Sequence, residues 1–245
     1  MKKIIEIMGK KYECSPIKNG EGSNATCYLL DNGKVLKVYH NDLSEYNVVY
    51  ATNFEPLLDV RNNTFIFPEQ LFINDEDVVI GYISPFIEGE TLLDNPNDIL
   101  IDEFVDKLDK VYEDISQISE RRVFTCEMGP KNIIFNDRFY IIDTDTYFIV
   151  NSLPYEVCLS HNISIFNASI LDYIVRNEKI NQDLFAFINK NQVLRLLWEE
   201  MTSRENAKPL LKEFIEELRT SLSDEYGTDI ETFNDFYQVF KRVRK

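Results

Sequence analysis

The most informative stretch of the chain is GEGSNATCYLLDNGKVLKVY, which spans residues 20–39. It contains two apolar runs, residues 26–30 and 34–39, on either side of Asn32-Gly33. An Asn-Gly turn between such runs is a strong short-range signal for a β-hairpin. A further strand is predicted at residues 11–14, so the glycine turn that begins this stretch lies between two strands. That context differs from a dinucleotide-binding fingerprint, in which the glycines lie between a strand and a helix.

The strand pattern continues through the first third of the chain. Residues 65–73 and 77–83 are apolar runs separated by a polar turn, and they predict two more strands. Between the two groups of strands, a helix is expected to begin at Asp42 or Ser44, either of which could cap it, and to end at Pro56. Five strands and one helix are therefore expected before residue 86.

After residue 86 the spacing of apolar residues changes to three and four, which is typical of helices. Residues 99–118 predict a long helix, and residues 133–142 predict a short β-hairpin. Later helical segments are expected at residues 166–175, 184–201, 209–222 and 232–243. The chain is therefore predicted to be an α+β protein with a single domain, 1–245, that has a small β-rich part at 1–86 and a larger α-rich part at 87–245.

The acidic composition of the chain limits its partners. Its 245 residues include 42 Asp and Glu against 26 Lys and Arg, for a formal net charge of -16. We expect no nucleic acid or anionic membrane as the main partner, because a phosphate-binding surface needs clustered Lys and Arg. No apolar run approaches the ~20 residues that span a bilayer, and Glu6 precedes any run of signal-peptide length. A cytoplasmic protein is therefore expected. The four scattered cysteines and two histidines have no zinc-site or disulfide-framework spacing.

The glycine turn is the first candidate binding site. A turn between two strands can cover the phosphates of a nucleotide with backbone N–H groups, and Gly20, Gly22, Ser23 and Ala25 are the candidate residues here. Lys37, on the strand that follows, can reach the α and β phosphates beneath that hairpin. Taken alone, the glycines favour a hairpin that merely needs positive φ, and an exposed strand lysine is the alternative interpretation of Lys37.

A second candidate site follows about a hundred residues later in the chain. Glu127 and Asn132 lie five residues apart, so a loop between them can aim a carboxylate at an incoming hydroxyl and an amide oxygen at a cation. Asp143 ends the hairpin predicted at residues 133–142, which returns it to the side of Asn132. Mg²⁺ prefers oxygen ligands, and Asn132 with Asp143 supplies them. Asp145 is a further metal ligand or an orienting group.

In order and spacing, these motifs resemble the protein-kinase-like superfamily along nearly the whole chain. The matching segments are the glycine loop at 20–25, the Val-x-Lys strand ending at Lys37, YISPFIEG at 82–89, Glu127-x-x-x-x-Asn132, and Asp143-Thr144-Asp145. The resemblance implies a two-lobed fold, with a small β-rich N-terminal lobe and a larger α-helical C-terminal lobe. It also implies ATP between the lobes, with its adenine bound by backbone near Pro85 and Ile87, and Mg²⁺ as the metal ion.

The same resemblance implies roles for individual residues. Lys37, Asp143 and Glu127 become the catalytic residues, and Asn132 contributes to both nucleotide and metal binding. The family pairs the strand lysine with a helix glutamate, for which Glu45 and Glu55 are the candidates.

The sequence also departs from the family pattern. Glu127 stands where the family has a catalytic aspartate, Thr125-Cys126 replaces the preceding His-Arg pair, and Thr144-Asp145 follows Asp143 in place of Phe-Gly. The segment from Asp143 to His161 is short and has no Ala-Pro-Glu triplet.

Three functions therefore stay open. The leading one is an ATP- and Mg²⁺-dependent protein kinase of the Ser/Thr type, divergent from its relatives, that phosphorylates an unidentified protein with Glu127 as base. The second is a small-molecule kinase of the aminoglycoside or choline type, although residues 89–125 are shorter than the insertion that usually forms its substrate pocket. The third is a pseudokinase that binds a nucleotide or a partner without transferring phosphate.

Overall fold

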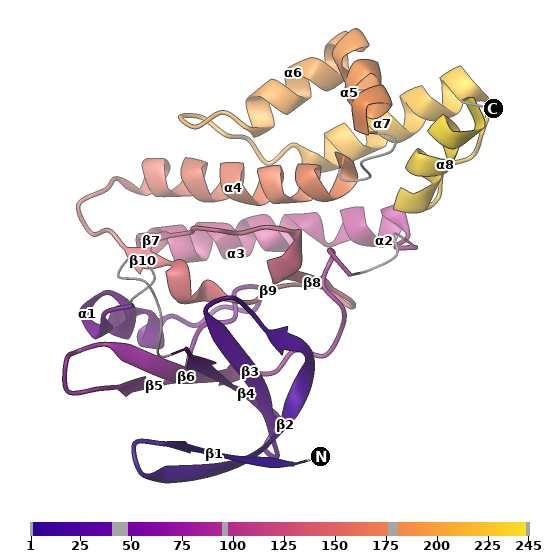
Figure 1. The fold of residues 1–245 in the computed structure, drawn as a ribbon. Coiled ribbons are helices and arrows are strands. Elements are labelled where there is room, and N and C mark those ends of the chain that lie inside the picture. The colour runs from indigo at the N-terminus through magenta and orange to yellow at the C-terminus, as the bar shows by residue number, and fades with distance from the viewer. Residues whose placement is uncertain (1, 41–48, 95–97, 176–180, 244–245) are drawn as a thin grey trace.

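The computed structural model describes residues 2–40, 49–94, 98–175 and 181–243. In this part of the chain an antiparallel six-stranded sheet has the order β1-β2-β3-β4-β6-β5. Figure 1 shows this sheet at one end of the molecule and the helices stacked beyond it. The strands are β1 Lys3–Ile7, β2 Lys10–Glu21, β3 Ala25–Leu30, β4 Lys34–Tyr39, β5 Gln70–Ile73 and β6 Val79–Pro85. The predicted α+β class is confirmed.

Strand β1 is the element of the sheet that the sequence pattern did not predict. Met8 and Gly9 both have positive φ, 50° and 74°, and they join Ile7 directly to Lys10 of β2. Two successive residues with positive φ form a turn whose twist suits an antiparallel hairpin. Met-Gly is a weaker signal for that turn than the Asn-Gly pair at residues 32–33, where the predicted hairpin between β3 and β4 is confirmed.

Gly81 of β6 allows the close approach of β4 that positions Lys37. It pairs with Val38, and a Cβ atom at Gly81 would lie 2.5 Å from the Lys37 carbonyl oxygen. Because that neighbour is backbone, the strands would have to separate to make room for a methyl group.

We expect Gly81→Ala to lower the free energy of unfolding by about 1–3 kcal/mol, because the added methyl overpacks the sheet. Urea unfolding measures the change. Gly129→Ala is the matched control, because its Cβ meets nothing within 4 Å and its φ of -149° is extended. Equal unfolding midpoints for the two variants would contradict the tight approach of β4 to β6.

The segment after β4 joins the sheet to the helical part. Residues 41–48, and with them the predicted helix start and Glu45, lie outside the described residues. Helix α1, Ala51–Phe54, continues as a 3₁₀ helix, η2 Glu55–Asp59, so the helical path does not end at Pro56. Pro is tolerated there because the first turn of a helix needs no N–H donor from it.

Residues 64–66 then bind a hairpin formed by β8, Ile133–Phe135, and β9, Phe139–Ile141. The N–H of Ile66 donates to the Ile141 carbonyl at 2.9 Å, and the N–H of Ile141 donates to the Thr64 carbonyl at 2.7 Å. The Thr64 hydroxyl donates to the buried Asp114 carboxylate at 2.7 Å. These bonds tie the chain between β4 and β5 to the hairpin that ends next to Asp143.

The helical part follows the predicted pattern, with two breaks inside predicted helices. Its helices are α2 Ile101–Asp106, α3 Leu108–Glu120, α4 Tyr155–Val175, α5 Asn181–Lys190, α6 Gln192–Met201, α7 Leu211–Tyr226 and α8 Phe233–Val243. The predicted helix at 99–118 breaks at Lys107, and the one at 184–201 breaks at Asn191. The Asn191 side chain accepts from the N–H groups of Val193 and Leu194 and so caps α6. Helix α4 begins well before the predicted residue 166.

Short elements join these helices and carry the predicted site residues. They are β7 Val123–Phe124, η3 Pro130–Asn132, β8 Ile133–Phe135, β9 Phe139–Ile141, η4 Thr144–Thr146 and β10 Phe148–Ile149. The hairpin predicted at residues 133–142 is confirmed as β8 paired with β9, and β7 pairs with β10.

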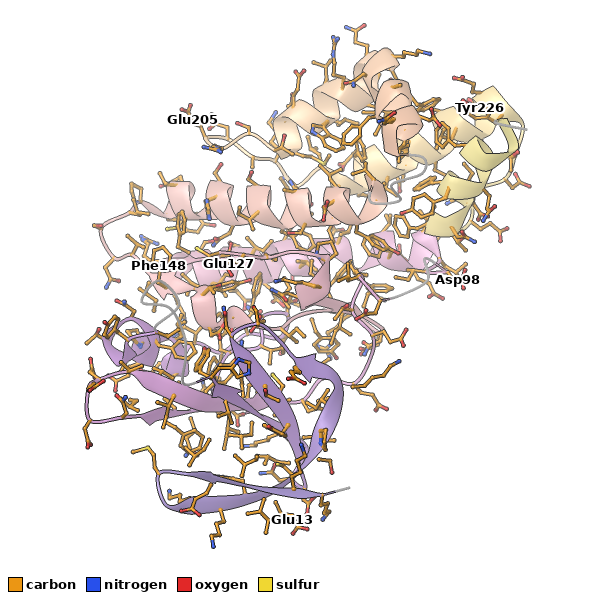
Figure 2. All side chains as sticks on the ribbon, in the orientation of Figure 1. Glu13, Asp98, Glu127, Phe148, Glu205 and Tyr226 are labelled. Carbon is orange, nitrogen blue, oxygen red and sulfur yellow. The ribbon has the colours of Figure 1, made fainter. Side chains whose placement is uncertain are left out.

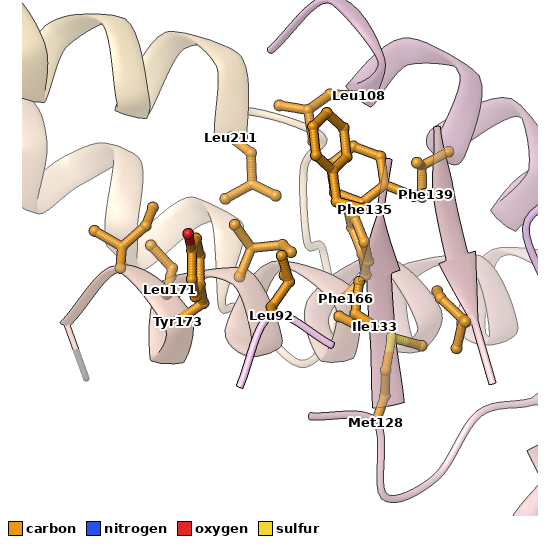
Figure 3. Close-up of a cluster of buried hydrophobic side chains, with 14 of the residues drawn as sticks. Leu92, Leu108, Met128, Ile133, Phe135, Phe139, Phe166, Leu171, Tyr173 and Leu211 are labelled. Carbon is orange, nitrogen blue, oxygen red and sulfur yellow. The ribbon is translucent and has the colours of Figure 1, made fainter. Parts of the chain in front are cut away.

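The hydrophobic core anchors the β8–β9 hairpin. Figure 3 shows Phe135 and Phe139 of the hairpin among apolar side chains that include Phe166 of α4. The ring of Phe139 lies 5.9 Å from that of Phe166, in an edge-to-face arrangement. Both rings are buried, so the hairpin is fixed relative to α4. Within the described residues, no helix combines the length and apolar character needed to cross a bilayer.

Candidate functional site

The structure brings Lys37 together with Asp143 and Asp145, which lie 106 and 108 residues further along the chain. Lys37 projects from β4, and the two aspartates flank the start of η4. The Lys37 Nζ forms an ion pair with Asp143 Oδ1 and lies 2.8 Å from Asp145 Oδ2. The side chain of Asp145 is 6% exposed and that of Asp143 is 39% exposed. The two carboxylates therefore differ in their access to solvent.

Two tyrosines that sequence reasoning missed complete the surroundings of Lys37. The Nζ atom lies 5.6 Å from the ring centroids of both Tyr39 and Tyr82. The Tyr39 hydroxyl donates to Asp145 Oδ2. Tyr39 is two residues after Lys37 on β4, hence on the same face of the sheet, and this period of two was the available signal. Tyr82 pairs directly with Lys37 across β4 and β6, which only the strand register reveals.

The charged side chains in this cluster shift one another's pKa values. Burial lowers the pKa of Lys37, but the Asp145 and Asp143 carboxylates raise it more, so Lys37 stays protonated. Burial and the Asp145 charge raise the pKa of Asp143 above its ordinary value, against the effect of Lys37. Burial also acts to raise the pKa of Asp145, but the Lys37 ammonium and the hydrogen bonds from Lys37 and Tyr39 outweigh it and lower that pKa. One ammonium thus faces two carboxylates, an arrangement that favours a further cation beside Asp143.

Helix α4 holds the loop that precedes Asn132. The side-chain oxygen Oδ1 of Asn162 accepts from both the N–H and the hydroxyl of Thr125, each at 3.0 Å. The Ser169 hydroxyl donates to the Met128 carbonyl at 2.7 Å. Thr125, Asn162 and Ser169 are all buried. Sequence reasoning did not identify Asn162 and Ser169, because nothing in a helical pattern tells which polar residue faces a distant loop.

Asn132 and Glu127 lie within this loop. The Asn132 side chain donates through Nδ2 to the Glu127 carbonyl at 3.1 Å, which leaves its Oδ1 as an acceptor. The N–H of Ile142 donates to the Asn132 carbonyl at 2.9 Å, so the residue before Asp143 is beside Asn132 as predicted. The Glu127 side chain is exposed, and it is labelled in Figure 2. Among the described residues, no hydrogen bond or ion pair engages its carboxylate.

Two of the predicted site residues have strained backbones. Glu127 has φ of 51° and Asp143 has φ of 63°, both in the left-handed region. For a residue other than glycine this conformation costs on the order of 1–3 kcal/mol and persists only where the surroundings enforce it. The hydrogen bonds of the loop and the packing of the hairpin supply that enforcement. The tertiary structure around Glu127 and Asp143 therefore fixes their backbone conformation.

The glycine turn at residues 20–25 is held by a hydrogen bond within the turn and by contacts with His40. The N–H of Gly22 donates to the Ala25 carbonyl at 2.9 Å, so it is engaged inside the turn. The His40 ring lies 3.2 Å through Nδ1 from the Ser23 carbonyl and 3.1 Å through Nε2 from the Thr26 hydroxyl. Gly20 has a packing role, because a Cβ there would lie 2.8 Å from the Cys27 carbonyl.

The remaining predicted residues lie at the end of β6 and in η2. Pro85 and Ile87 are both half-buried, and the N–H of Phe86 between them is 3.3 Å from the Gly33 carbonyl. Glu55 is exposed, and the ion pairs that Lys37 makes within the described residues are those to Asp143 and Asp145.

The donors at this site match the ligand chemistry of Mg²⁺. Within the described ranges, no three His, Cys, Asp or Glu side chains gather as a metal site. The predicted magnesium ligands are two carboxylates, Asp143 and Asp145, and the amide oxygen of Asn132. Only two of these three residues are of the types that such a group would contain. These are hard oxygen donors, and Mg²⁺ in proteins commonly takes one or two carboxylates together with substrate phosphates. The residues present therefore fit the ion.

Neither models of known protein families nor curated proteins match this sequence. The resemblance to the protein-kinase-like superfamily therefore stays a prediction, and the geometry of the site carries the functional argument.

Proposed function

We propose that this protein is an ATP- and Mg²⁺-dependent phosphotransferase of the protein-kinase-like superfamily, with a protein hydroxyl as acceptor. In this proposal the sheet is the small lobe, the helices form the large lobe, and ATP lies between them. The observation that carries the proposal is the meeting of Lys37 with Asp143 and Asp145 from opposite ends of a long stretch of chain. A lysine that is only 12% exposed beside paired carboxylates suits a ligand that brings both phosphate and a divalent cation.

The residues of the site have different roles in the proposed phosphoryl transfer. Lys37 binds phosphate oxygens, and the backbone of the glycine hairpin covers them. Asn132 and Asp143 would hold Mg²⁺, which neutralises charge on the phosphates. Catalysis of this reaction depends mainly on positioning and electrostatic stabilisation, so rigid placement of these groups matters most. The hydrogen bonds from α4 to the loop at Thr125 and Met128 support that rigidity.

Glu127 is the proposed base. Its exposed carboxylate is accessible to an incoming hydroxyl, and its backbone carbonyl is tied to Asn132. A carboxylate in this position accepts the hydroxyl proton as the phosphate is transferred. The short span at residues 89–125, which α2 and α3 largely fill, favours a protein acceptor over a small molecule that needs an inserted pocket.

Binding without transfer is the second candidate function, and the pairing of Lys37 favours it. Lys37 already contacts both carboxylates, so phosphate oxygens must replace part of that pairing before catalysis. A protein that keeps these ion pairs would bind a nucleotide without turning it over. Incubation with labelled ATP and Mg²⁺ separates the two functions, because only an active kinase transfers label to itself or to a substrate.

ATP with Mg²⁺ is expected to raise the melting temperature of the protein. A ligand at 100 times its dissociation constant stabilises the native state by ~2.7 kcal/mol, which corresponds to about 5–10 °C for a chain of this size. Differential scanning fluorimetry measures the shift with Mg²⁺ and with EDTA. Lys37→Met should reduce the shift, whereas Lys34→Met, on the same strand but paired with Glu69 at 2.6 Å, should retain it. No shift with any purine nucleotide would rule out the proposed function.

A further inference from the structure

We propose that Asp145 and Tyr39 are positioning residues for Lys37, and that Asp143 is the carboxylate left available to a metal ion. The inference rests on the proposed function, and it assigns different roles to two carboxylates that the sequence treats alike. It also supplies a partner for Lys37 other than the helix glutamates Glu45 and Glu55.

The Asp145 carboxylate is buried and accepts its hydrogen bonds from neighbouring side chains of the protein. A single oxygen, Oδ2, accepts from both the Lys37 ammonium at 2.8 Å and the Tyr39 hydroxyl. The Asp145 side chain is only 6% exposed. A buried carboxylate of this kind needs its donors, because removing one leaves charge without compensation. Asp145, Tyr39 and Lys37 therefore form one buried unit.

Asp143 has the opposite character. Its side chain is 39% exposed although it also contacts Lys37. It follows Ile142, whose N–H donates to the Asn132 carbonyl, so the second predicted metal ligand is close in the fold. Asp143 is thus the carboxylate with both access and a neighbouring oxygen donor.

The separate roles of Asp143 and Asp145 keep an ion-pair partner for Lys37 when a metal ion is bound. A carboxylate that coordinates a cation is less available to an ammonium, so Lys37 would lose a partner whenever Asp143 binds metal. Lysine has a flexible four-carbon stem and needs fixed neighbours to hold its charge in one place. Asp145 keeps one ion pair, and the rings of Tyr39 and Tyr82, each 5.6 Å from Nζ, restrict the remaining space.

A double-mutant cycle on unfolding tests the pairing without any nucleotide. Lys37→Met is combined with Asp145→Asn in one cycle and with Asp143→Asn in a parallel cycle, using urea unfolding of the full chain. We expect the coupling between Lys37 and Asp145 to change the unfolding constant by about tenfold more than the coupling to Asp143, because contacting buried groups couple most strongly. Equal couplings, or a larger one for Asp143, would overturn the proposal.

Nucleotide binding tests the division of roles. Asp145→Asn and Tyr39→Phe should weaken ATP binding several-fold by the same factor with Mg²⁺ and with EDTA, because the metal ligand remains. Tyr140→Phe is the matched control, because it removes a tyrosine–aspartate hydrogen bond to exposed Asp137 and should change neither value. Tyr39→Phe removes one oxygen atom, so it serves if Asp145→Asn does not fold.

Two results would distinguish an error in the roles of Asp145 and Asp143 from an error in the proposed function. Loss of the Mg²⁺ effect in Asp145→Asn or Tyr39→Phe would assign Asp145 to the metal and overturn the inference. If the unaltered protein binds no nucleotide, the proposed function fails, and the unfolding cycle alone decides whether Asp145 holds Lys37.

Discussion

Asp143→Asn is expected to abolish phosphoryl transfer and to make ATP binding insensitive to Mg²⁺. The substitution replaces a carboxylate that would hold the ion with a neutral amide, which is a weaker ligand for a hard cation. Metal-assisted charge stabilisation contributes several kcal/mol to such reactions, so we expect a loss of about 10³-fold or more in turnover. Transfer from labelled ATP and titration of nucleotide with and without Mg²⁺ measure the two effects.

The fold should survive this substitution. Asp143 has φ of 63°, and asparagine is among the few residues that tolerate the left-handed region. Lys37 also keeps Asp145 as an ion-pair partner, so no buried charge is left alone. Asp137→Asn is the control, because it makes the same change at an exposed turn of the same hairpin. If Asp143→Asn unfolds the protein while Asp137→Asn does not, Asp143 is structural and its assignment to the metal is wrong.

Glu127→Gln is expected to lower turnover while ATP affinity stays unchanged. An amide cannot accept the proton of the substrate hydroxyl, and it orients that hydroxyl less well than a carboxylate does. General-base contributions are typically ~10²- to 10⁴-fold, or roughly 3 to 5 kcal/mol of barrier. Initial rates at saturating ATP measure the loss. Glu205→Gln makes the same change on an exposed loop that Figure 2 shows on the other side of helix α4 from Glu127, and its rate should equal that of the unaltered protein.

Glu127→Asp is the sharper test of the same residue. The shorter carboxylate should preserve or raise activity if Glu127 has the role that an aspartate has in the resembling family. The backbone supports this substitution, since Asp is enriched over Glu at positive φ. An unchanged rate in Glu127→Gln, in a preparation that clearly phosphorylates itself or a substrate, would remove Glu127 from the mechanism.

Local patterns in the sequence predict much of the fold. The hairpin of β3 and β4 follows from an Asn-Gly turn between apolar runs, and the hairpin of β8 and β9 follows in the same way from apolar runs around a polar turn. Both signals depend on residues close together in the chain. The helical part also follows from apolar spacing, although the breaks at Lys107 and Asn191 do not. The Asn191 side chain caps α6, whereas no side-chain hydrogen bond caps α3 at Lys107.

The sequence likewise predicts one part of the candidate site, and the other part depends on tertiary packing. Residue type, order and spacing singled out Lys37, Asn132, Asp143 and Asp145, because an amine followed by amide and carboxylate groups matches the phosphate and Mg²⁺ ligands of a nucleotide site. Sequence patterns could not show that Asp145 is buried against Lys37 while Asp143 is half-exposed, since that difference depends on the approach of β4 to the loop after β9. Nor could they find the α4 side chains, such as Asn162, that hold the Glu127 loop. These contacts join residues far apart in the chain, and only packing of the whole molecule decides which side chains meet.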